Sequence, residues 1–205
     1  MSIYLIRHGE TPGNANRVIQ VAETPLSDRG LQQAEALATR LADAGVVHIL
    51  ASDLSRAHMT AQALERTTGA PLELEPLLQE RNLGDLRGTP YSELGFDPFA
   101  PDYVPPAGES WDAFHDRVAR AWRRVADVAP RLDGHLAVVT HGLVCRAVVQ
   151  HHVTLRGSAA SDPEATGAAF GNTCLSVIES QAPFGVELLA CTAHLGGSAP
   201  EGAPV

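Results

Sequence analysis

The feature that most constrains the fold is the alternation of short apolar runs with segments of helical periodicity. Three apolar runs of a few residues each precede a polar turn: 2–6, 46–50 and 136–140. Apolar residues recur every three or four positions in three other segments: 31–41, 54–64 and 111–128. This order is typical of strands joined by helices. We therefore expect an α/β fold, a three-layer sandwich with a central, largely parallel sheet flanked by helices.

The rest of the chain fits the same domain. We expect a further helix after Gly142 and a closing pair of strands at 173–179 and 185–191, so that residues 1–195 form a single domain. The last stretch, 196–205, is rich in glycine, alanine and proline and has no periodicity. It is expected to be a flexible tail.

One segment, 88–116, departs from the alternating pattern. It holds five of the chain's 14 prolines and six of its ten aromatic residues, but no arginine or lysine. Irregular segments of this kind lie outside sheet cores, and in α/β folds they commonly cover the edge at which the strands end. We therefore expect an irregular lid insertion at about 88–116.

The charge balance excludes several classes of function. The chain has 15 arginines, no lysine and 24 acidic residues, which gives a formal net charge of −9. This balance argues against nucleic-acid partners, and the missing lysine removes Schiff-base and P-loop chemistry. No apolar run is long enough to span a membrane. Three scattered cysteines without a C-x-x-C pair favour free thiols in a cytoplasmic protein. A homodimer is possible, but the sequence does not decide the oligomeric state.

Charged residues follow each of the three expected strands. Arg7 and His8 follow the first strand, Arg56 lies at the start of the helix after the second, and His141 follows the third. The carboxyl ends of parallel strands meet at one edge of a sheet. We therefore expect these four side chains to lie close together.

The expected cluster is suited to a phosphoryl group. Guanidinium groups match its oxygens, Gly9 would let the backbone approach a ligand, and a helix starting at Gly142 would direct free N–H groups at an anion. No set of metal ligands is evident, so the site needs its own nucleophile and acid. A neutral imidazole such as that of His8 can attack phosphorus. Glu80 is the expected proton donor to the departing oxygen, once its surroundings raise its pKa.

These residues belong to a longer series of motifs that runs from residue 1 to about 180. The motifs are Arg7-His8-Gly9-Glu10-Thr11 with Asn14, Pro25-Leu26-Ser27, Ser52-Asp53-Leu54-Ser55-Arg56-Ala57, Glu80-Arg81, Gly108-Glu109-Ser110, Thr140-His141-Gly142 and Asn172-Thr173. In this order they resemble the histidine phosphatase superfamily, the phosphoglycerate mutase-like proteins. One departure is Gln20, which stands where the family often has glycine, in a loop that borders the substrate.

The resemblance implies roles for individual residues. His8 would be the phosphorylated nucleophile and Glu80 the general acid and base. The groups that would hold the phosphoryl oxygens are Arg7, Asn14, Arg56, a protonated His141 and the amide of Gly142. Neither a metal nor a cofactor is implied, and the partner would be a small-molecule phosphate ester.

Members of this family pass the phosphoryl group either to water or to a hydroxyl of a substrate. The resemblance places basic residues for the carboxylate of phosphoglycerate in the segment between the acid and the second histidine. Here 88–116 carries six acidic residues and no arginine or lysine. We therefore predict a metal-independent phosphomonoesterase for a small phosphorylated metabolite, with a neutral or partly apolar leaving group. Four lid side chains would contact that group or fasten the lid to the body: Tyr91, Phe96, Phe99 and Tyr103.

Three alternatives keep the same cluster of residues. The first is cofactor-dependent phosphoryl transfer of the phosphoglycerate mutase type. The second is a non-catalytic phospholigand-binding protein. The third is a metallophosphohydrolase with His8, Glu10 and His141 as metal ligands.

Four neighbouring residues have open or structural interpretations. Arg81 and Arg87 either bind an anionic leaving group or pair with nearby carboxylates and solvent. Ser52 and Asp53 are expected to cap the helix that follows them, since serine and aspartate are preferred at helix N-termini.

Overall fold

The structure, a computed structural model, describes residues 1–156 and 170–196. Its helices are α1 (Pro12–Ala15), α2 (Asp28–Leu41), α3 (Ser55–Thr68), α4 (Trp111–Val128) and α5 (Gly142–His151). Its strands are β1 (Ser2–Arg7), β2 (Val46–Ala51), β3 (Leu72–Leu74), β4 (His135–Thr140), β5 (Thr154–Leu155), β6 (Leu175–Glu179) and β7 (Gly185–Cys191). The predicted tail, 196–205, lies outside the described residues apart from Gly196.

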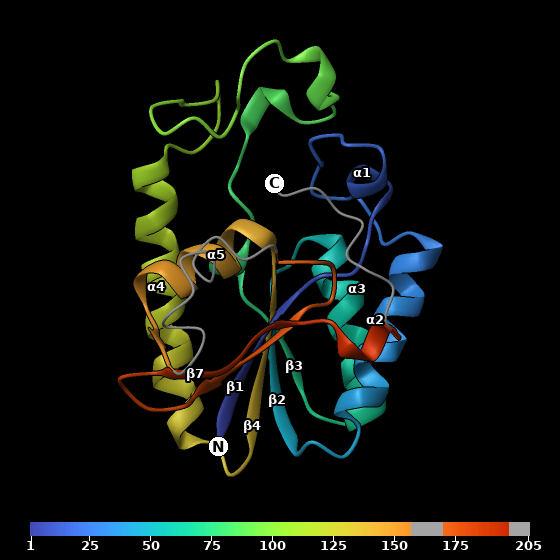
Figure 1. Cartoon of the computed structure of the whole chain (residues 1–205), viewed down its shortest axis with the longest axis vertical. Helices are drawn as coiled ribbons and strands as arrows, with labels where there is room; N and C mark the ends of the chain where they lie inside the picture. Colours follow the sequence, from blue (N-terminus) through green and yellow to red (C-terminus); the bar gives the residue numbers. More distant parts are fainter. Residues whose placement is uncertain (157–169, 197–205) are drawn as a thin grey trace.

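Within the described residues, the strands form one sheet in the order β3-β2-β4-β1-β6-β7-β5. The central strand β1 pairs in parallel with β4 and antiparallel with β6. β2 pairs in parallel with β3 and β4, and β5 pairs in parallel with β7. The predicted α/β fold with a largely parallel sheet is confirmed (Figure 1). The short strands β3 and β5 have no counterpart among the predicted strands.

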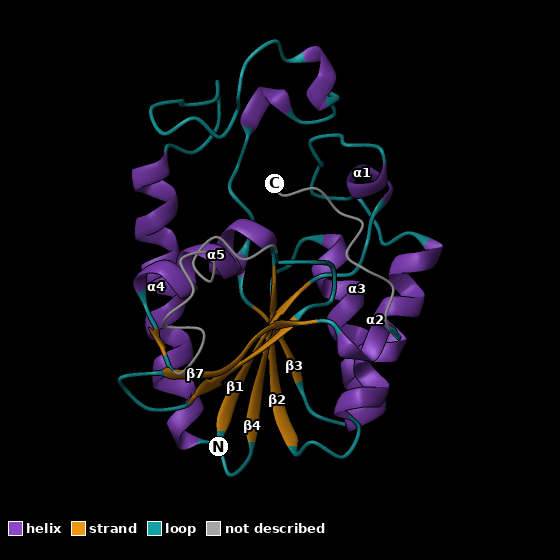
Figure 2. Ribbon diagram, viewed as in Figure 1, coloured by secondary structure: helices purple, strands orange, loops and turns teal. Residues whose placement is uncertain are grey.

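Helices cover both faces of the sheet, which gives the predicted three layers (Figure 2). One core lies under α4 and α5 and includes Phe114 and Leu5. The other lies under α2 and α3 and includes Leu37, Leu64 and Ile6. Leu5 and Ile6 are adjacent in β1 and enter opposite cores, as the alternation of side chains along a strand requires. Each fully buried side chain of this size contributes about 1.5–3 kcal/mol to folding.

Two glycines fix the packing of α2 against the chain after β1. An ideal Cβ on Gly30 would lie 2.0 Å from the carbonyl oxygen of Glu10, and a Cβ on Gly9 would lie 2.6 Å from the carbonyl oxygen of Gly30. Ser27 caps α2 by accepting the N–H of Gly30, as the sequence predicts. The expectation that Gly9 leaves room for a ligand is wrong, because the space is filled by the start of α2.

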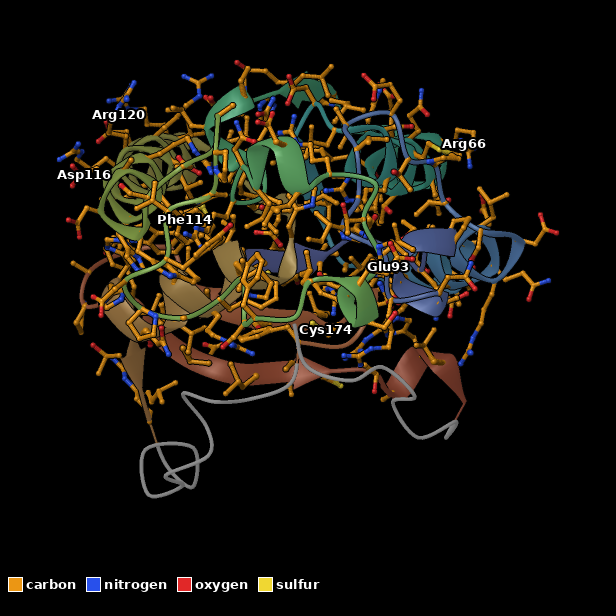
Figure 3. The ribbon with its side chains drawn as sticks, turned by 90° about the horizontal axis from the view of Figure 1, so that it is seen from above. Arg66, Glu93, Phe114, Asp116, Arg120 and Cys174 are labelled. Carbon is orange, nitrogen blue, oxygen red and sulfur yellow. The ribbon has the colours of Figure 1, made fainter. Side chains whose placement is uncertain are left out.

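The chain between Leu78 and α4 leaves the sheet and passes over the edge at which β1, β2 and β4 end (Figure 1). Seen from above, the part that carries Glu93 crosses between α4, which carries Phe114, and α3, which carries Arg66 (Figure 3). We call residues 79–110 the lid. Since α4 begins at Trp111, the predicted insertion of 88–116 includes the first residues of that helix. Among the described residues, no helix combines the length and apolar character needed to cross a bilayer.

Candidate active site

The ends of three neighbouring strands bring the predicted residues together. The N–H of His8, directly after β1, donates to the carbonyl of Thr140 at the end of β4 (2.9 Å). The N–H of Ser52, directly after β2, donates to the carbonyl of Val139 (3.0 Å). The rings of His8 and His141 therefore lie side by side, with their centroids 5.1 Å apart. This proximity is what the rule for parallel strand ends predicts.

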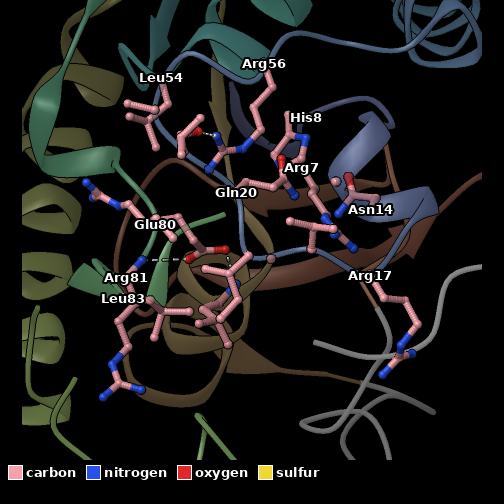
Figure 4. A pocket seen from close by; sticks show the side chains of 18 of the residues that line it. Arg7, His8, Asn14, Arg17, Gln20, Leu54, Arg56, Glu80, Arg81 and Leu83 are labelled. Carbon is pink, nitrogen blue, oxygen red and sulfur yellow. Dashed lines mark hydrogen bonds between the residues drawn. The ribbon is translucent and has the colours of Figure 1, made fainter. Parts of the chain in front are cut away.

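One cavity at this edge is lined by most of the predicted site residues: Arg7, His8, Asn14, Arg56, Glu80 and Gly142. Arg7, His8 and Arg56 are grouped on one side of it, and Glu80 lies on the other (Figure 4). His141 does not line the cavity wall, but its ring lies next to that of His8.

His8 has the protonation state of a nucleophile. Its Nδ1 lies 2.7 Å from the carbonyl oxygen of Gly9, and because a carbonyl only accepts, Nδ1 carries the hydrogen. The other ring nitrogen, Nε2, then holds a free electron pair. Burial, followed by the charges of Arg56 and Arg7, lowers the pKa of His8 well below its usual value. The ring is therefore neutral at pH 7 and able to attack phosphorus.

His141 is fully buried, and one of its ring nitrogens lacks a partner. Its Nε2 lies 2.8 Å from Oγ of Ser52, which also accepts the N–H of Leu54 (3.3 Å). A hydroxyl can donate one hydrogen bond and accept two, so this contact is compatible with a hydrogen on either ring nitrogen of His141. Nδ1 is the ring nitrogen that has no partner. Burial, and then the charge of Arg56, lowers the pKa of His141 well below its usual value. Without a ligand the ring is therefore neutral at pH 7, and a protonated His141 with a phosphoryl group bound stays a prediction.

Arg56 is a buried cation and Arg7 a half-buried one, and both have unused hydrogen-bond donors. Arg7 donates to the carbonyl of Phe170, and Arg56 donates to the carbonyl of Val21 (3.2 Å). Nε of each arginine, like Nδ1 of His141, is buried without a partner. Burial lowers the pKa of Arg56 to about 10, so the group keeps its charge at pH 7. Two cations, their two unpaired buried Nε–H donors and the unpartnered Nδ1 of His141 form a site for an anion, since unpaired buried donors are costly.

Glu80 has the character of a general acid. Its two carboxyl oxygens accept the backbone N–H groups of Arg81 and Leu143, each at 3.1 Å. Burial raises the pKa of the Glu80 carboxyl, against the lowering effect of these hydrogen bonds and of Arg56. A raised pKa keeps more of the carboxyl protonated near neutral pH, as donation to a leaving oxygen requires.

Asn14 is held in α1 by a capping box, which orients its side chain. Oδ1 of Asn14 accepts from the N–H of Thr11 (3.3 Å) and from Nδ2 of Asn172 (3.2 Å). Since its oxygen is occupied, the amide NH₂ of Asn14 is the end available to a ligand in the cavity. The hydroxyl of Thr11 contacts Oε1 of Gln20 (2.9 Å), which joins this turn to the cavity wall.

The four predicted lid aromatic residues divide into two pairs. Tyr91 and Phe99 line the cavity, with their ring centroids 6.0 Å apart. Phe96 and Tyr103 pack on each other at 4.9 Å and do not line it. Tyr91 and Phe99 are thus placed where they could meet a leaving group, which stays a prediction. Phe99 also packs against the core under α4, whereas Phe96 and Tyr103 contact each other within the lid.

The guanidinium of Arg81 binds backbone carbonyls of the lid and is therefore not free to bind a leaving group. Its guanidinium donates to the backbone carbonyls of Pro98, Tyr103 and Glu109, at 3.3, 2.8 and 3.1 Å. It also lies 3.9 Å from the ring centroid of Trp111. Neither an ion pair with Glu80 nor one with Asp85 is found for Arg81 within the described residues.

The prediction that Ser52 and Asp53 cap α3 is wrong. The N-cap of α3 is Leu54, which has no side-chain capping bond. Ser52 instead holds Nε2 of His141, and Asp53 accepts from Nε2 of Gln79 (2.7 Å). The position of Ser52 directly after β2 is the signal that indicates a role in the site, because it matches the position of His8 after β1.

Metal-binding geometry is not found around His8. Across residues 1–156 and 170–196, no group of three or more histidine, cysteine, aspartate or glutamate side chains is placed to hold a metal ion. Glu10, one of the three alternative ligands, accepts from Ser27 (2.9 Å) and pairs with Arg29 (3.5 Å).

A family model described as the histidine phosphatase superfamily (branch 1) matches residues 3–186. The phosphoglycerate mutase-like protein 4 of Arabidopsis thaliana is 37% identical over 164 residues, which cover 72% of this chain and 69% of that protein. The probable phosphoglycerate mutase GpmB of Escherichia fergusonii is 44% identical over 87 residues, but these cover only 42% of this chain and 40% of the relative.

Solved structures extend this similarity over nearly the whole chain. The alpha-ribazole phosphatase from Shigella flexneri has a TM-score of 0.78 and 25% identity, covering 94% of this chain and 97% of that one. A mycobacterial glucosyl-3-phosphoglycerate phosphatase, solved with VO3, has a TM-score of 0.73 and 23% identity, covering 91% and 96%. At these identities the second likeness concerns the fold alone.

Proposed function

Because this chain belongs to the histidine phosphatase superfamily, we propose that it hydrolyses a small phosphate monoester through a phosphohistidine on His8. Glu80 acts as general acid and base, and the reaction needs no metal ion. One observation carries the proposal: His8, whose Nε2 has a free electron pair, lines the same cavity as Arg7 and Arg56, and each of these arginines has a buried Nε–H without a partner. The phosphatase names among the neighbouring structures support the hydrolase class.

In the first step, Nε2 of His8 attacks phosphorus in line with the ester oxygen. The phosphorus–nitrogen bond forms as the phosphorus–oxygen bond to the leaving group breaks, and Glu80 gives its proton to the departing oxygen. Arg7, Arg56 and His141 stabilise the charge on the remaining oxygens. The bound dianion would itself raise the pKa of His141, which then donates through Nδ1.

In the second step, water replaces the alcohol. The Glu80 carboxylate removes a proton from water, the oxygen of that water attacks phosphorus, and the bond to Nε2 of His8 breaks. Inorganic phosphate leaves and Glu80 is again protonated. The hydrogen bond from Nδ1 of His8 to the Gly9 carbonyl keeps the ring in one orientation and one tautomer through both steps.

Phosphoryl transfer between hydroxyls is the second candidate, because several relatives are named as mutases. The two reactions share the first step and differ only in what accepts the phosphoryl group from His8. A panel of phosphate esters, followed by measuring free phosphate and rearranged ester together, separates them. Release of phosphate faster than rearrangement supports hydrolysis, and the reverse result supports the mutase.

The covalent step has its own test. Protein incubated briefly with a ³²P-labelled ester and quenched should carry a label that is stable to alkali and labile to acid, as expected for phosphohistidine. His8→Ala should lose the label and slow turnover by a factor on the order of 10⁴ or more. The matched control is His58→Ala, a histidine of α3 that does not line the cavity. Near-normal phosphate release by His8→Ala would reject the assignment, and binding without any label would favour a phospholigand-binding protein.

Several further expectations are part of the proposal. The partner is a small-molecule ester rather than a nucleic acid or a membrane, and the protein acts in the cytoplasm. Chelator treatment should leave turnover unchanged. A homodimer stays a prediction, for which light scattering in solution is the direct measurement.

A further inference from the structure

A series of hydrogen bonds leads from the end of α2 to the backbone of His8. Arg40, in the last turn of α2, donates through Nη1 to Nδ1 of His194 (3.2 Å). Nε2 of His194 lies 3.1 Å from Oγ1 of Thr173. The backbone N–H of Thr173 donates to the carbonyl oxygen of His8 (3.2 Å). The proposed catalytic steps use neither His194 nor Thr173, yet both are connected to the nucleophile.

His194 has one tautomer in these surroundings. It lies in a short 3-10 helix, Ala193–Leu195, which follows β7 and packs against α2 (Figure 1). Burial, and then the charge of Arg40, lowers the pKa of His194 to about 4, so the ring is neutral at pH 7. Because a guanidinium only donates, Nδ1 of His194 accepts from Arg40, and the ring hydrogen is on Nε2. Nε2 therefore donates to Oγ1 of Thr173, whose own hydrogen goes to the carbonyl of Asn172 (2.8 Å).

The backbone of Thr173 is strained and depends on such contacts. Its φ is 53°, in the left-handed region, where a β-branched side chain crowds the backbone. Thr173 is fully buried, and its hydroxyl is bound by His194 on one side and by the carbonyl of Asn172 on the other. Loss of His194 would leave the buried hydroxyl with one partner fewer, and the strained conformation would lose part of its support.

The turn at Asn172 and Thr173 holds the backbone of the nucleophile. The carbonyl of His8 accepts the N–H of Thr173 and Nδ2 of Asn172, each at 3.2 Å. A nucleophile must approach phosphorus in line with the leaving oxygen, and a misplacement of about 1 Å can slow a reaction by a factor of about 10². If Thr173 relaxed to a negative φ, its N–H would leave the His8 carbonyl, and the ring that follows this backbone would be free to shift.

We infer that His194 is a positioning residue for His8: it keeps Thr173 in the left-handed conformation, which holds the turn on the His8 carbonyl and directs the His8 ring at the phosphoryl group. The inference rests on the proposed function, because it concerns the nucleophile of that reaction. Neither His194 nor Thr173 lines the cavity. His194 therefore acts through Thr173, on the rate of the chemical step rather than on the binding of the ester.

Three substitutions at one position separate positioning from a purely structural role. His194→Ala removes both side-chain contacts and should lower kcat about tenfold or more, with KM changed less than about twofold. In His194→Gln the amide can accept from Arg40 and donate to Thr173, so most of kcat should be kept. In His194→Asn the shorter amide can accept from Arg40 but does not reach Thr173, so kcat should be as low as in His194→Ala.

The matched control is His58→Ala, the same change at a half-buried position of α3 that does not line the cavity, and it should leave kcat unchanged. Circular dichroism and thermal unfolding of each variant show whether the fold is kept. Normal kcat in His194→Ala, or equal kcat in His194→Gln and His194→Asn, would overturn the inference.

A double variant tests whether the effect passes through Thr173. Glycine adopts a positive φ without the crowding of a side chain, so Thr173→Gly no longer needs the support of His194. Added to Thr173→Gly, His194→Ala should therefore change kcat less than about twofold, against about tenfold in the otherwise unchanged protein. Independent residues would instead give losses that multiply, and that result would contradict an action through Thr173.

Amide hydrogen exchange keeps the test independent of turnover. In His194→Ala, the N–H of Thr173 should exchange about tenfold faster or more, as measured by NMR without any ester, whereas His194→Gln should keep the slow exchange. Amides of β4 should exchange at unchanged rates. Equal acceleration in β4 would show a general loss of stability and would overturn the inference.

The two assays together separate the inference from the proposed function. If the exchange of Thr173 responds as expected but no ester is hydrolysed, the proposed function is wrong and the hold of His194 on the His8 backbone stands. If phosphate is released but neither kcat nor the exchange of Thr173 responds to His194→Ala, the inference is wrong and the proposed function stands.

Discussion

The floor of the cavity consists of the residues that directly follow β1, β2 and β4, and backbone hydrogen bonds between the strands hold it in place. The lid above it is held by arginine side chains. On the floor, β1 and β4 are in register up to Arg7 and Thr140, and the chain after each strand end keeps this pairing. In the lid, Arg81 and Arg117 donate to backbone carbonyls of segments that have no regular structure. A side chain on the floor can therefore be changed without moving the backbone. Arg81 in the lid and Arg117 on α4, by contrast, bind the backbone of these segments directly.

Arg117 joins the two regions. From α4 it donates to the carbonyls of Leu77 (2.8 Å), Gln79 (2.7 Å) and Glu80 (3.2 Å), and it binds the carboxylate of Glu109 at 2.8 and 2.9 Å. The guanidinium of Arg117 thus fixes the position of the backbone that leads from the sheet to Glu80, the proposed acid. We expect substitutions on the floor to change the chemical step and substitutions of lid arginines to change stability and the titration of Glu80.

The largest effect is expected on the floor, at Arg56. Arg56→Ala removes a buried cation that stabilises charge on the phosphoryl oxygens, so kcat should fall by a factor of about 10²–10³, or about 2.7–4 kcal/mol. Steady-state kinetics measure this loss. Circular dichroism should show a native fold, since no strand ladder depends on this side chain. A fall in KM alone, with kcat unchanged, would contradict the assigned role.

The second largest effect is expected at Arg117, as a loss of stability. Arg117→Gln leaves three carbonyls and the Glu109 carboxylate without their cation, which should lower the free energy of unfolding by about 2 kcal/mol. Denaturant titration measures this change. The control is Arg123→Gln on the same helix, an exposed arginine without an ion pair among the described residues, which should change the free energy of unfolding by less than about 0.5 kcal/mol. Equal destabilisation by both variants would show that the lid does not depend on Arg117.

The pH profile of kcat/KM separates the floor from the lid. Activity needs unprotonated His8 and protonated Glu80. It should therefore be lost as pH falls through the lowered pKa of His8 and as pH rises through the raised pKa of Glu80. Arg117→Gln loosens the chain around Glu80 and admits water, so the alkaline limb should move down by about one pH unit while the acid limb stays. If Arg117→Gln moved the acid limb instead, the lid would influence the titration of His8, and the floor and the lid would not act separately.

The smallest effect distinguishes the two faces of the lid. Phe99→Ala removes a ring from the cavity wall and should raise KM about threefold to tenfold. Phe96→Ala removes a ring that is 47% exposed and faces Tyr103, so KM should change less than about twofold. Kinetics on one ester with both variants give the comparison. A larger effect from Phe96 would mean that the lid rearranges over the substrate.

The floor could be predicted from the sequence because its rules are local. Short apolar runs gave the strands, and the parallel order then placed His8, Arg56 and His141 at one edge before any contact was known. Their roles remain predictions. The lid could not be predicted in the same way, because the partners of Arg81 and Arg117 are backbone carbonyls. Every residue has a carbonyl, so no side chain marks the segments that these arginines bind.

Other misses have equally physical causes. Arg17 has no signal in the sequence that places it at the site, and the pairing of Ile19 with Gly88 and Thr89 brings it to the same cavity as Arg87. The role of Ser52 beside His141 depends on a contact between residues 89 positions apart, which no local pattern specifies. The strands β3 and β5 have three and two residues, too few to show a periodic pattern.

The mutual contact of Gly9 and Gly30 has a consequence for how this enzyme tolerates change. Any side chain at position 30 would collide with the backbone of Glu10 and displace the nucleophile two residues earlier. A saturation library at position 30, selected for phosphate release, should therefore return glycine alone, while the exposed neighbour Leu31 should accept many residues. The start of α2 thus limits which substitutions keep His8, the proposed nucleophile, in place.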